Sequence, residues 1–368
     1  INPYTGVKWK YEFMQQNSWN RLVAGSYYTF IPYLPKTTKF IYNKEHFEKA
    51  GIENPPRTWR EFINVLKILK ENGYTPFGLG IKDSYEQIFL LCNYITDHIY
   101  YPKVNEMDVF YRDGVIQMNE MIRAMEKGLI DTQDTEMIPA LELFREFSEY
   151  WSDGYVNTTD YDAKLMFIEG KASIILGSSW ELPEYLDRGE LKWSSFSFPV
   201  ITNEDLPSSN NRAMDPEVLK TAYAVSHSTI RRKTVDCCVD FLMTFTAYEA
   251  SAVLDENFSI YRYDENYVPS QSKNSIFQKD YEAYPRGEIM PNATPLLYSF
   301  DNRDIQNEVC RELVHYIKGE ISAEEFLDIR EGSTLIYVDK LKKIYEWSDS
   351  NDYGNDADKT IRKREKQK

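Results

Sequence analysis

The chain has few of the residues from which metal and redox sites are usually built. It contains four cysteines and four histidines among 368 residues. Adjacent cysteines rarely bridge each other, and no cysteine spacing matches a zinc-binding pattern. The cysteines, Cys92, Cys237, Cys238 and Cys310, all lie in helix-like patterns, where cysteine usually behaves as a small buried hydrophobe. The scattered histidines form no His-x-x-x-His pair, so we expect no bound metal and no cofactor.

Long apolar runs and an excess of basic charge are missing as well. No segment is long and apolar enough to span a membrane. No signal peptide precedes the folded-looking residues Ile1–Tyr4, so we expect the natural N-terminus to lie upstream. The 58 acidic residues outnumber the 43 basic ones, for a net charge of −15. This balance argues against nucleic acid or an anionic membrane surface as the main partner.

Motifs for common enzyme chemistry are also missing. There is no Gly-x-Ser-x-Gly elbow and no phosphate-cradling glycine loop, and Gly78-Leu79-Gly80 lacks the third glycine of a dinucleotide fingerprint. A calcium loop at 349–360 fails because Tyr353 and Thr360 occupy ligand positions five and twelve. Acidic residues are numerous enough to offer carboxylate pairs for glycoside hydrolysis, but no pair is singled out. We therefore predict no catalytic residues, with a glycan-active enzyme as an alternative.

Aromatic residues are what the chain has in excess. They make up 15% of the residues and include 28 tyrosines, whereas the hydrophobic content of 42% is ordinary for a soluble globular protein. A tyrosine-rich surface and core would account for this composition. A binding site lined with flat rings, as in carbohydrate-binding proteins, is the functional alternative, and composition alone favours the first explanation.

The stretch at 39–62 is the most informative part of the chain. An apolar strand runs into Tyr42-Asn43-Lys44, and a short helix follows that stops at Gly51. Pro55-Pro56 then forces an extended link. Thr58 precedes a new helix with Glu61 three residues on, which is a capping box. This segment therefore predicts a strand, a helix, a turn and a second helix.

Strand-like and helix-like patterns alternate along most of the chain. Such alternation favours an α/β architecture with a mostly parallel sheet. Pro32 and Pro35 interrupt the first strand, so that Tyr33 and Leu34 lie in an extended crossing. The predicted strands are 27–31, 38–42, 75–81, 172–176 and 221–225, and the predicted helices are 59–72, 86–100, 115–127, 139–152, 229–248, 303–318 and 322–347.

Four segments, in order, resemble the extracellular solute-binding proteins of bacterial ABC importers. The first is the 39–62 stretch. The second is Phe167-Ile168-Glu169-Gly170-Lys171-Ala172-Ser173-Ile174, followed by Gly177-Ser178-Ser179-Trp180. The third is a strand ending Ala224-Val225-Ser226, with Cys238-Val239-Asp240-Phe241-Leu242 in the next helix. The fourth, Arg286-Gly287-Glu288-Ile289-Met290-Pro291-Asn292, is similar to a segment of the family's maltodextrin binders. The resemblance spans about residues 25–335.

The resemblance implies a periplasmic-binding-protein type II fold, with two α/β lobes, mixed and mostly parallel sheets, and an incomplete first lobe. The family begins with a βαβα run, and nothing of that kind precedes Ile1. The implied boundaries are 1–35 for the remnant of lobe one and the first crossing, 36–255 for lobe two, 256–304 for a return segment in lobe one, 305–348 for the last helices of lobe two, and 349–368 for a flexible tail.

The same resemblance suggests ligand-binding residues, one position at a time. Tyr85 and Trp180 match aromatic residues that stack on sugar rings, and Asp83 matches a carboxylate that accepts hydrogen bonds from sugar hydroxyls. Tyr33 is a further candidate because it lies at the crossing, and Arg212 because it lies in a polar loop. Ring stacking and charge-assisted hydrogen bonds suit a carbohydrate. Trp59 is assigned to helix packing.

Two departures disfavour maltodextrin itself as the ligand. Lys36 stands where the family has a glutamate, and Asp301 stands near the place of a tryptophan. The expected protein is a monomeric, extracellular carbohydrate receptor, periplasmic or anchored as a lipoprotein, that delivers an oligosaccharide to the permease subunits of an ABC importer. A ligand sensor that feeds a membrane signalling partner is the second alternative.

Overall fold

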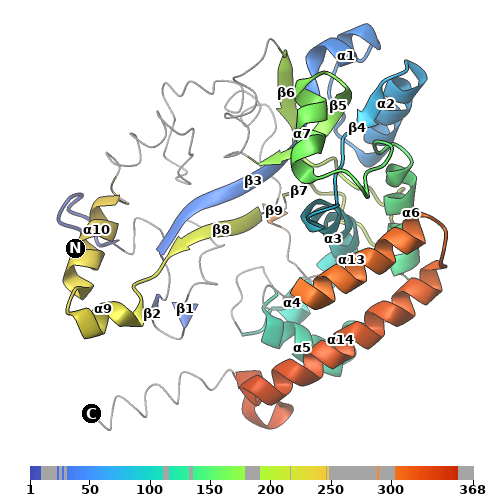
Figure 1. Cartoon of the computed structure of the whole chain (residues 1–368). Coiled ribbons are helices and arrows are strands. Elements are labelled where there is room, and N and C mark those ends of the chain that lie inside the picture. The colour runs from blue at the N-terminus through green and yellow to red at the C-terminus, as the bar shows by residue number, and fades with distance from the viewer. Residues whose placement is uncertain are drawn as a thin grey trace.

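A mixed β-sheet with helices on both faces forms the main body of the structure, a computed structural model (Figure 1). The structure describes residues 1–9, 23–24, 27–28, 31–110, 116–131, 136–178, 191–215, 217–245, 247, 288–289 and 303–354. The strands of the main sheet are β3 (Ile31–Asn43), β4 (Thr75–Phe77), β5 (Ala172–Ser178), β6 (Trp193–Phe196) and β8 (Glu217–Tyr223).

The sheet is built around β3, which runs against all the other strands. β3 pairs antiparallel with β5, β6 and β8, and β4 pairs parallel with β5. The sheet is therefore mixed, as expected, but most of its described pairs are antiparallel rather than parallel. The expectation of mostly parallel pairing was wrong because β3 lies in the middle of the sheet and runs opposite to the other strands. Each of its three pairs is therefore antiparallel.

β3 is continuous over 13 residues and has two different sets of neighbours. Its second half pairs with β5 and β6, whereas its first half, Ile31–Thr37, pairs with β8. The register shifts on either side of Leu34, next to Pro32 and Pro35. Proline has no N–H for the ladder, so irregular pairing is the way a strand accommodates it. The extended conformation predicted for Tyr33 and Leu34 is thus confirmed, but the predicted interruption at Pro32 and Pro35 was wrong, because β3 continues through both prolines with shifts of register.

Two sets of helices pack on the two faces of the sheet. Successive side chains of β3 point to opposite faces. Phe40 joins the large core with α2, α3, α6 and α13, and Ile41 joins a smaller core with Phe167 of α7. The helices are α1 (Lys44–Lys49), α2 (Trp59–Glu71), α3 (Glu86–Tyr100), α4 (Val104–Met107), α5 (Met118–Glu126), α6 (Met137–Ser148), α7 (Asp160–Ile168), α13 (Arg303–Ile317) and α14 (Ala323–Tyr345).

Helix boundaries follow the local signals closely. Thr58 and Glu61 form the predicted capping box at the start of α2, and Ser322 with Glu325 forms another at the start of α14. Gly51 takes a positive φ of 74° just after α1, a conformation that glycine adopts without steric cost. Two 3₁₀ helices are also described, η3 (Tyr101–Lys103) and η4 (Asp349–Gly354).

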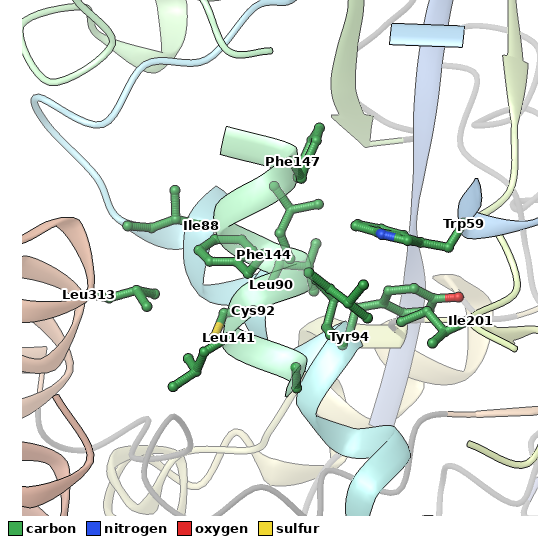
Figure 2. Packing of buried hydrophobic residues seen from close by; sticks show 14 of the residues in the cluster. Trp59, Ile88, Leu90, Cys92, Tyr94, Leu141, Phe144, Phe147, Ile201 and Leu313 are labelled. Carbon is green, nitrogen blue, oxygen red and sulfur yellow. The ribbon is translucent and has the colours of Figure 1, made fainter. Parts of the chain in front are cut away.

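The large core lies between the sheet and α2, α3 and α6. Figure 2 shows side chains of α3 and α6 facing each other, with Trp59 and Ile201 beside them. Trp59 is fully buried, which confirms its assignment to packing. Its ring contacts Phe62 and Phe147 at centroid distances of 5.6 and 5.8 Å. Aromatic pairs at this spacing add about 0.5–1.5 kcal/mol beyond the area that they bury.

A second, smaller group of elements lies at the far end of β3 and β8 (Figure 1). It contains α9 (His227–Arg232), α10 (Val235–Phe245) and N-terminal residues. The Asn2 side-chain amide donates to the backbone oxygen of Met243 at 3.1 Å, and the Tyr4 hydroxyl donates to Asp240 at 2.8 Å. Short pairs of strands, β1 (Val23–Ala24) with β2 (Tyr27–Tyr28) and β7 (Met214–Asp215) with β9 (Glu288–Ile289), are also present.

Two local predictions are corrected here. The single helix predicted over 229–248 is two helices, because Lys233 takes a left-handed conformation with φ of 58° and ends α9. The cysteines are not all buried. Cys92 and Cys310 are buried, but Cys237 is exposed, because α10 buries only Leu242 among its described side chains. The lobe boundaries at 35, 255, 304 and 348 stay predictions.

Candidate functional site

The carboxyl ends of β4, β5 and β6 meet at one edge of the sheet. This follows from their common direction, opposite to β3. The chain leaves β4 into the loop 78–85, leaves β5 at Ser178, and leaves β6 into the loop 197–213. Ligands of open α/β sheets bind outside the carboxyl ends of the strands. This edge is therefore the candidate site, and four of the five predicted ligand residues follow these strand ends in the sequence.

The loop after β4 is hydrogen-bonded along its length to the segment 150–160. The Ile81 backbone N–H donates to the Tyr155 carbonyl at 3.0 Å, and the Lys82 N–H donates to the Thr158 carbonyl at 3.0 Å. The Ser152 hydroxyl lies 3.1 Å from both the N–H and the carbonyl oxygen of Leu79. These bonds explain why β4 ends at Phe77 rather than at the predicted Ile81. The Gly78 N–H still donates to the Ile174 carbonyl of β5 at 2.8 Å, and from Leu79 onward the bonds described for the loop go to the segment 150–160 instead.

Gly80 allows this close approach. A Cβ atom at Gly80 would lie 2.1 Å from the Thr159 carbonyl oxygen, far inside van der Waals contact. The contacting atom belongs to the backbone, so it has no flexible side chain that could move aside. The glycine therefore fixes the distance between the loop after β4 and the amino terminus of α7.

Asp83 is held by the amino terminus of α7. Its Oδ1 atom accepts a hydrogen bond from the Asp160 backbone N–H at 3.0 Å. The Asp160 carboxylate in turn accepts from the Gln87 amide and from the Lys164 ammonium group, the latter at 2.6 Å. Thr159 caps α7 by accepting from the Asp162 N–H. Asp83 is exposed to solvent, so a solute can reach its side chain.

Tyr85 lies directly before α3, at its N-cap position. Its carbonyl oxygen accepts from the Phe89 N–H at 3.0 Å, which is the first bond of the helix. The side chain is half-buried and packs against the large core. A ring held in this way keeps part of its surface available while losing little freedom on binding. Asp83 and Tyr85 are therefore brought together on one fixed loop.

The other three predicted residues have different outcomes. Arg212 is exposed in the loop 197–213, and its backbone N–H donates to the Asn210 side chain at 3.0 Å. Tyr33 lies in the half of β3 that pairs with β8, at the first register shift, between Pro32 and Leu34. Trp180 lies outside the described residues, two positions after the end of β5. No contact described in the structure joins any of these three to Asp83 or Tyr85.

Sequence reasoning missed Asp160, which holds Asp83, and it missed Gln87 and Lys164, which bind the Asp160 carboxylate. Asp160, Gln87 and Lys164 lie on α7 and α3, and α7 itself was not predicted. A signal was present, because Thr159-Asp160-Tyr161-Asp162 has the Thr-x-x-acid pattern of a helix start. The pairing of Gln87 with Asp160 had no such signal, because it joins residues 73 positions apart.

The described residues also limit the chemistry of the edge. Among the parts of the chain that the structure describes, no three His, Cys, Asp or Glu residues are grouped so that they could hold a metal ion. In the same described ranges, no helix has the length and apolarity that crossing a membrane requires.

A family model described as "Bacterial extracellular solute-binding protein" matches residues 2–213. The matched range covers more than half of the chain and includes the whole β4, β5 and β6 edge. The chain belongs to this solute-binding family. The resemblance drawn from the four sequence segments is therefore confirmed at the level of the family.

Curated relatives match this solute-binding protein over short stretches. An sn-glycerol-3-phosphate-binding periplasmic protein of Rhizobium meliloti is 40% identical over 51 residues, which is 13% of this chain and 12% of the relative. An uncharacterised ABC transporter extracellular-binding protein of Pyrococcus horikoshii is 27% identical over 140 residues, 38% of this chain and 28% of the relative. The matches thus span less than a third of either relative's length.

A solved structure is similar to this chain over a much larger share of its length than the curated relatives are. A chitin oligosaccharide binding protein aligns with a TM-score of 0.64 over 86% of this chain and 73% of its own, at 15% sequence identity. The fold class predicted from the sequence, an α/β fold of the periplasmic-binding-protein type II, is therefore confirmed for the solute-binding chain.

Proposed function

We propose that this chain is the extracellular substrate-binding component of an ABC importer and that it captures a carbohydrate, with an oligosaccharide as the expected ligand. The observation that carries the proposal is the family match, which includes the sheet edge bearing Asp83 and Tyr85. A protein of similar fold is named as a chitin oligosaccharide binding protein, and this supports a sugar as the ligand class.

The chemistry of the edge suits a sugar. The Tyr85 ring offers a flat apolar surface for the C–H face of a pyranose, and such contacts are worth about 0.5–1.5 kcal/mol beyond area burial. The Asp83 carboxylate accepts hydrogen bonds from ring hydroxyls, and charge-assisted bonds fix the orientation of the sugar. We propose Trp180 as a second stacking ring, with Tyr33 and Arg212 as further contacts.

The paired crossing of β3 and β8 supplies a hinge in this proposal. Both strands run between the main sheet and the group of elements that contains α9 and α10 (Figure 1). A solute that contacts both sides favours a closed arrangement by its differential contacts. Of the domain boundaries predicted from the sequence, this proposal keeps the beginning of lobe two at residue 36 within β3. It differs from the predicted span 36–255 by placing α9 and α10 with the N-terminal residues, on the other side of the hinge.

The remaining parts of the proposal concern partners and place. The membrane permease subunits of the importer would recognise the closed form with its bound sugar. The receptor would act outside the cell or in the periplasm, as a monomer. It would be either anchored as a lipoprotein or free. The known relatives of this chain are named for binding rather than for catalysis. We propose accordingly that the chain binds its solute without changing it.

Calorimetry with a panel of neutral saccharides tests the function. Chitobiose, cellobiose, xylobiose and raffinose serve as probes, each followed by chromatography of the recovered sugar. Binding of at least one sugar, recovered intact, is the expected result. Failure of all sugars together with binding of another solute class would refute the carbohydrate proposal, and cleavage of a bound sugar would refute the absence of catalysis.

Two substitutions test the site itself. Tyr85→Ala should weaken sugar binding by about tenfold or more, because aromatic stacking and the area that it buries are lost together. Asp83→Asn should weaken it through the loss of a charged acceptor. Tyr345→Ala, on the exposed end of α14, is the matched control because Tyr345 is 51% exposed and belongs to another surface. Equal effects of Tyr85→Ala and Tyr345→Ala would remove Tyr85 from the site.

A further inference from the structure

One face of α14 exposes large apolar side chains. Ile336 is 69% exposed and Ile344 is 59% exposed. The opposite face is buried, because Phe326 joins the large core and Tyr337 and Leu341 pack in a smaller core with α5. Figure 1 shows α14 running beside α13, along the outer side of the helices. Large apolar side chains gathered on one exposed face often mark a contact with a partner or a membrane.

Two lysines lie on the same face as Ile336 and Ile344. Lys340 follows Ile336 by four residues, and Lys343 follows Lys340 by three, so the side chains are neighbours on the helix surface. Both lysines are exposed. The long stem of a lysine can lie along an apolar surface while its ammonium group stays in water. This face therefore combines apolar side chains with basic ones.

The charges on α14 nearly cancel one another. Lys342 forms an ion pair with Glu126 of α5, and Asp339 and Glu346 are exposed beside the two lysines of the face. The helix face thus supplies apolar area but little net charge. Electrostatic attraction to a partner must come from another part of the chain.

The segment 359–368 supplies positive charge. It reads Lys-Thr-Ile-Arg-Lys-Arg-Glu-Lys-Gln-Lys, with six basic residues and one acidic residue, a net charge of +5. The whole chain has a net charge of −15, so residues 1–358 carry −20. The stretch 349–358 contains four aspartates, of which Asp349 is paired with Lys127 at 2.8 Å. A concentrated run of one charge is typical of a segment that binds a partner of the opposite charge.

From these two features we propose that the exposed face of α14 and the basic segment 359–368 together bind the surface of an anionic phospholipid bilayer. Each basic residue near such a surface strengthens binding by about fivefold. Ile336 and Ile344 enter the boundary between the headgroups and the acyl chains, as the apolar residues of interfacial helices do. A polybasic segment and an apolar contact are two weak signals, and together they give reversible membrane binding.

The apolar face favours a bilayer over a soluble polyanion. A polyanion would attract the basic segment, but it would offer Ile336 and Ile344 no apolar environment. The negative charge of residues 1–358 is repelled by the same bilayer, so binding orients the protein with α14 toward the membrane. This surface shares no residue with the candidate site at Asp83 and Tyr85, and the proposal does not depend on the identity of the solute.

Surface plasmon resonance with captured vesicles gives the first test, on the full chain without a charged tag. One set of vesicles contains equal parts of phosphatidylglycerol and phosphatidylcholine, and the other is pure phosphatidylcholine. We expect binding to the anionic vesicles at low salt, at least about a hundredfold tighter than to the neutral ones. This binding should weaken as salt rises, because screening weakens interactions between exposed charges.

A charge variant and its matched control give the second test. The charge variant replaces four residues of the basic segment, Arg362→Gln, Lys363→Gln, Arg364→Gln and Lys366→Gln. The control replaces four exposed lysines on other elements, Lys44→Gln, Lys49→Gln, Lys67→Gln and Lys171→Gln. The charge variant should lose about a hundredfold or more in affinity for the anionic vesicles. The control loses the same total charge and should lose much less, because its lysines lie away from α14.

A third test changes the apolar face. Ile336→Ser should weaken binding to the anionic vesicles by about threefold to tenfold, because the isoleucine side chain no longer leaves water. Ile230→Ser on α9 is the matched control, since Ile230 is 61% exposed and lies on another surface. Far-UV circular dichroism of each variant shows that the protein remains folded, as expected for changes at exposed positions.

Each outcome decides the proposal. Equal binding to both kinds of vesicle, or binding to neither, would overturn it. Equal losses in the charge variant and in its lysine control would show that total charge matters and that the basic segment does not. Binding of soluble polyphosphate as tightly as the anionic vesicles, with no effect of Ile336→Ser on either, would assign the basic segment to a polyanion and overturn the membrane proposal.

Discussion

Helices α3 and α10 are both apolar, and both contain cysteine, yet they occupy opposite environments. Twelve of the fifteen residues of α3 are buried, whereas Leu242 is the one buried residue described in the eleven-residue α10. Figure 2 shows α3 packed against α6 within the large core. The contrast teaches that an apolar composition does not by itself bury a helix. A helix is buried only where other elements pack against it. The candidate site lies directly before α3, the buried helix, because Tyr85 is the N-cap residue of α3.

The largest expected difference between the two helices lies in side-chain truncation. Leu91 of α3 is 1% exposed, and Phe241 of α10 is 60% exposed. Leu91→Ala should lower the free energy of unfolding by about 2–5 kcal/mol, because it removes buried area and leaves a cavity. Phe241→Ala should change it by about 0.5 kcal/mol or less. Urea unfolding followed by far-UV circular dichroism measures both, and similar losses in the two variants would contradict the comparison.

A second contrast lies between glycines at crowded and open positions. Gly80→Ala places a Cβ atom 2.1 Å from the Thr159 carbonyl oxygen, so the loop and α7 must separate. We expect a loss of about 1–3 kcal/mol in the free energy of unfolding, together with weaker sugar binding. Gly332→Ala in α14 is the matched control, because a Cβ there meets nothing within 4 Å. In a helix interior that change should be neutral or stabilising by about 0.5–1 kcal/mol. A Gly80→Ala protein with unchanged stability and affinity would show that the close approach is not required.

A third test uses a histidine on the buried helix. His98 is fully buried, and its Nδ1 lies 3.0 Å from the Ser209 oxygen, whose hydroxyl donates to the Ile201 carbonyl. The Ser209 oxygen is therefore an acceptor, and the neutral ring donates from Nδ1. Burial lowers the pKa of His98 from 6.5 to about 3.

The depressed pKa determines the sign of the pH dependence. The unfolded chain binds a proton near pH 6.5 that the folded chain does not accept, so the stability contributed by neutral His98 is present above pH 6.5. It is lost as pH falls from 6.5 towards 3, and at pH 5 the loss is about 2 kcal/mol. His98→Asn should flatten this part of the stability profile. The same substitution at His227, on exposed α9, is the control, and an unchanged slope in His98→Asn would refute the assignment.

The smallest effect concerns thiol reactivity. Burial raises the pKa of Cys92 to about 12, and it raises that of Cys310 as well, whereas Cys237 of α10 is exposed. Thiolates react and thiols do not. Mass spectrometry after brief iodoacetamide treatment should find Cys237 labelled and the two buried cysteines unlabelled until urea is added. Labelling of Cys92 as fast as Cys237 in the native protein would contradict the burial of α3.

Local signals predicted some elements well and others poorly. The start of α2 was found because the Thr58 and Glu61 capping box is contained within four residues, and α3 was predicted with the boundaries that it has. The helix predicted over 229–248 was wrong because a left-handed turn at Lys233 leaves no clear mark in the sequence. The direction of β3 relative to its neighbours was misjudged because pairing joins residues more than 130 positions apart.

The sequence by itself determined the family, the type II fold, the capped helix starts and the loop that carries Asp83 and Tyr85. These depend on short patterns or on recurring motifs, which a linear chain displays directly. Only the tertiary structure decided that Asp83 accepts a hydrogen bond from Asp160 and that Gly80 lies close to the Thr159 backbone. It also decided that α3 is buried while α10 is exposed. Each of these depends on residues far apart in the chain, because hydrogen bonding and burial act over ångströms in space and not along the sequence.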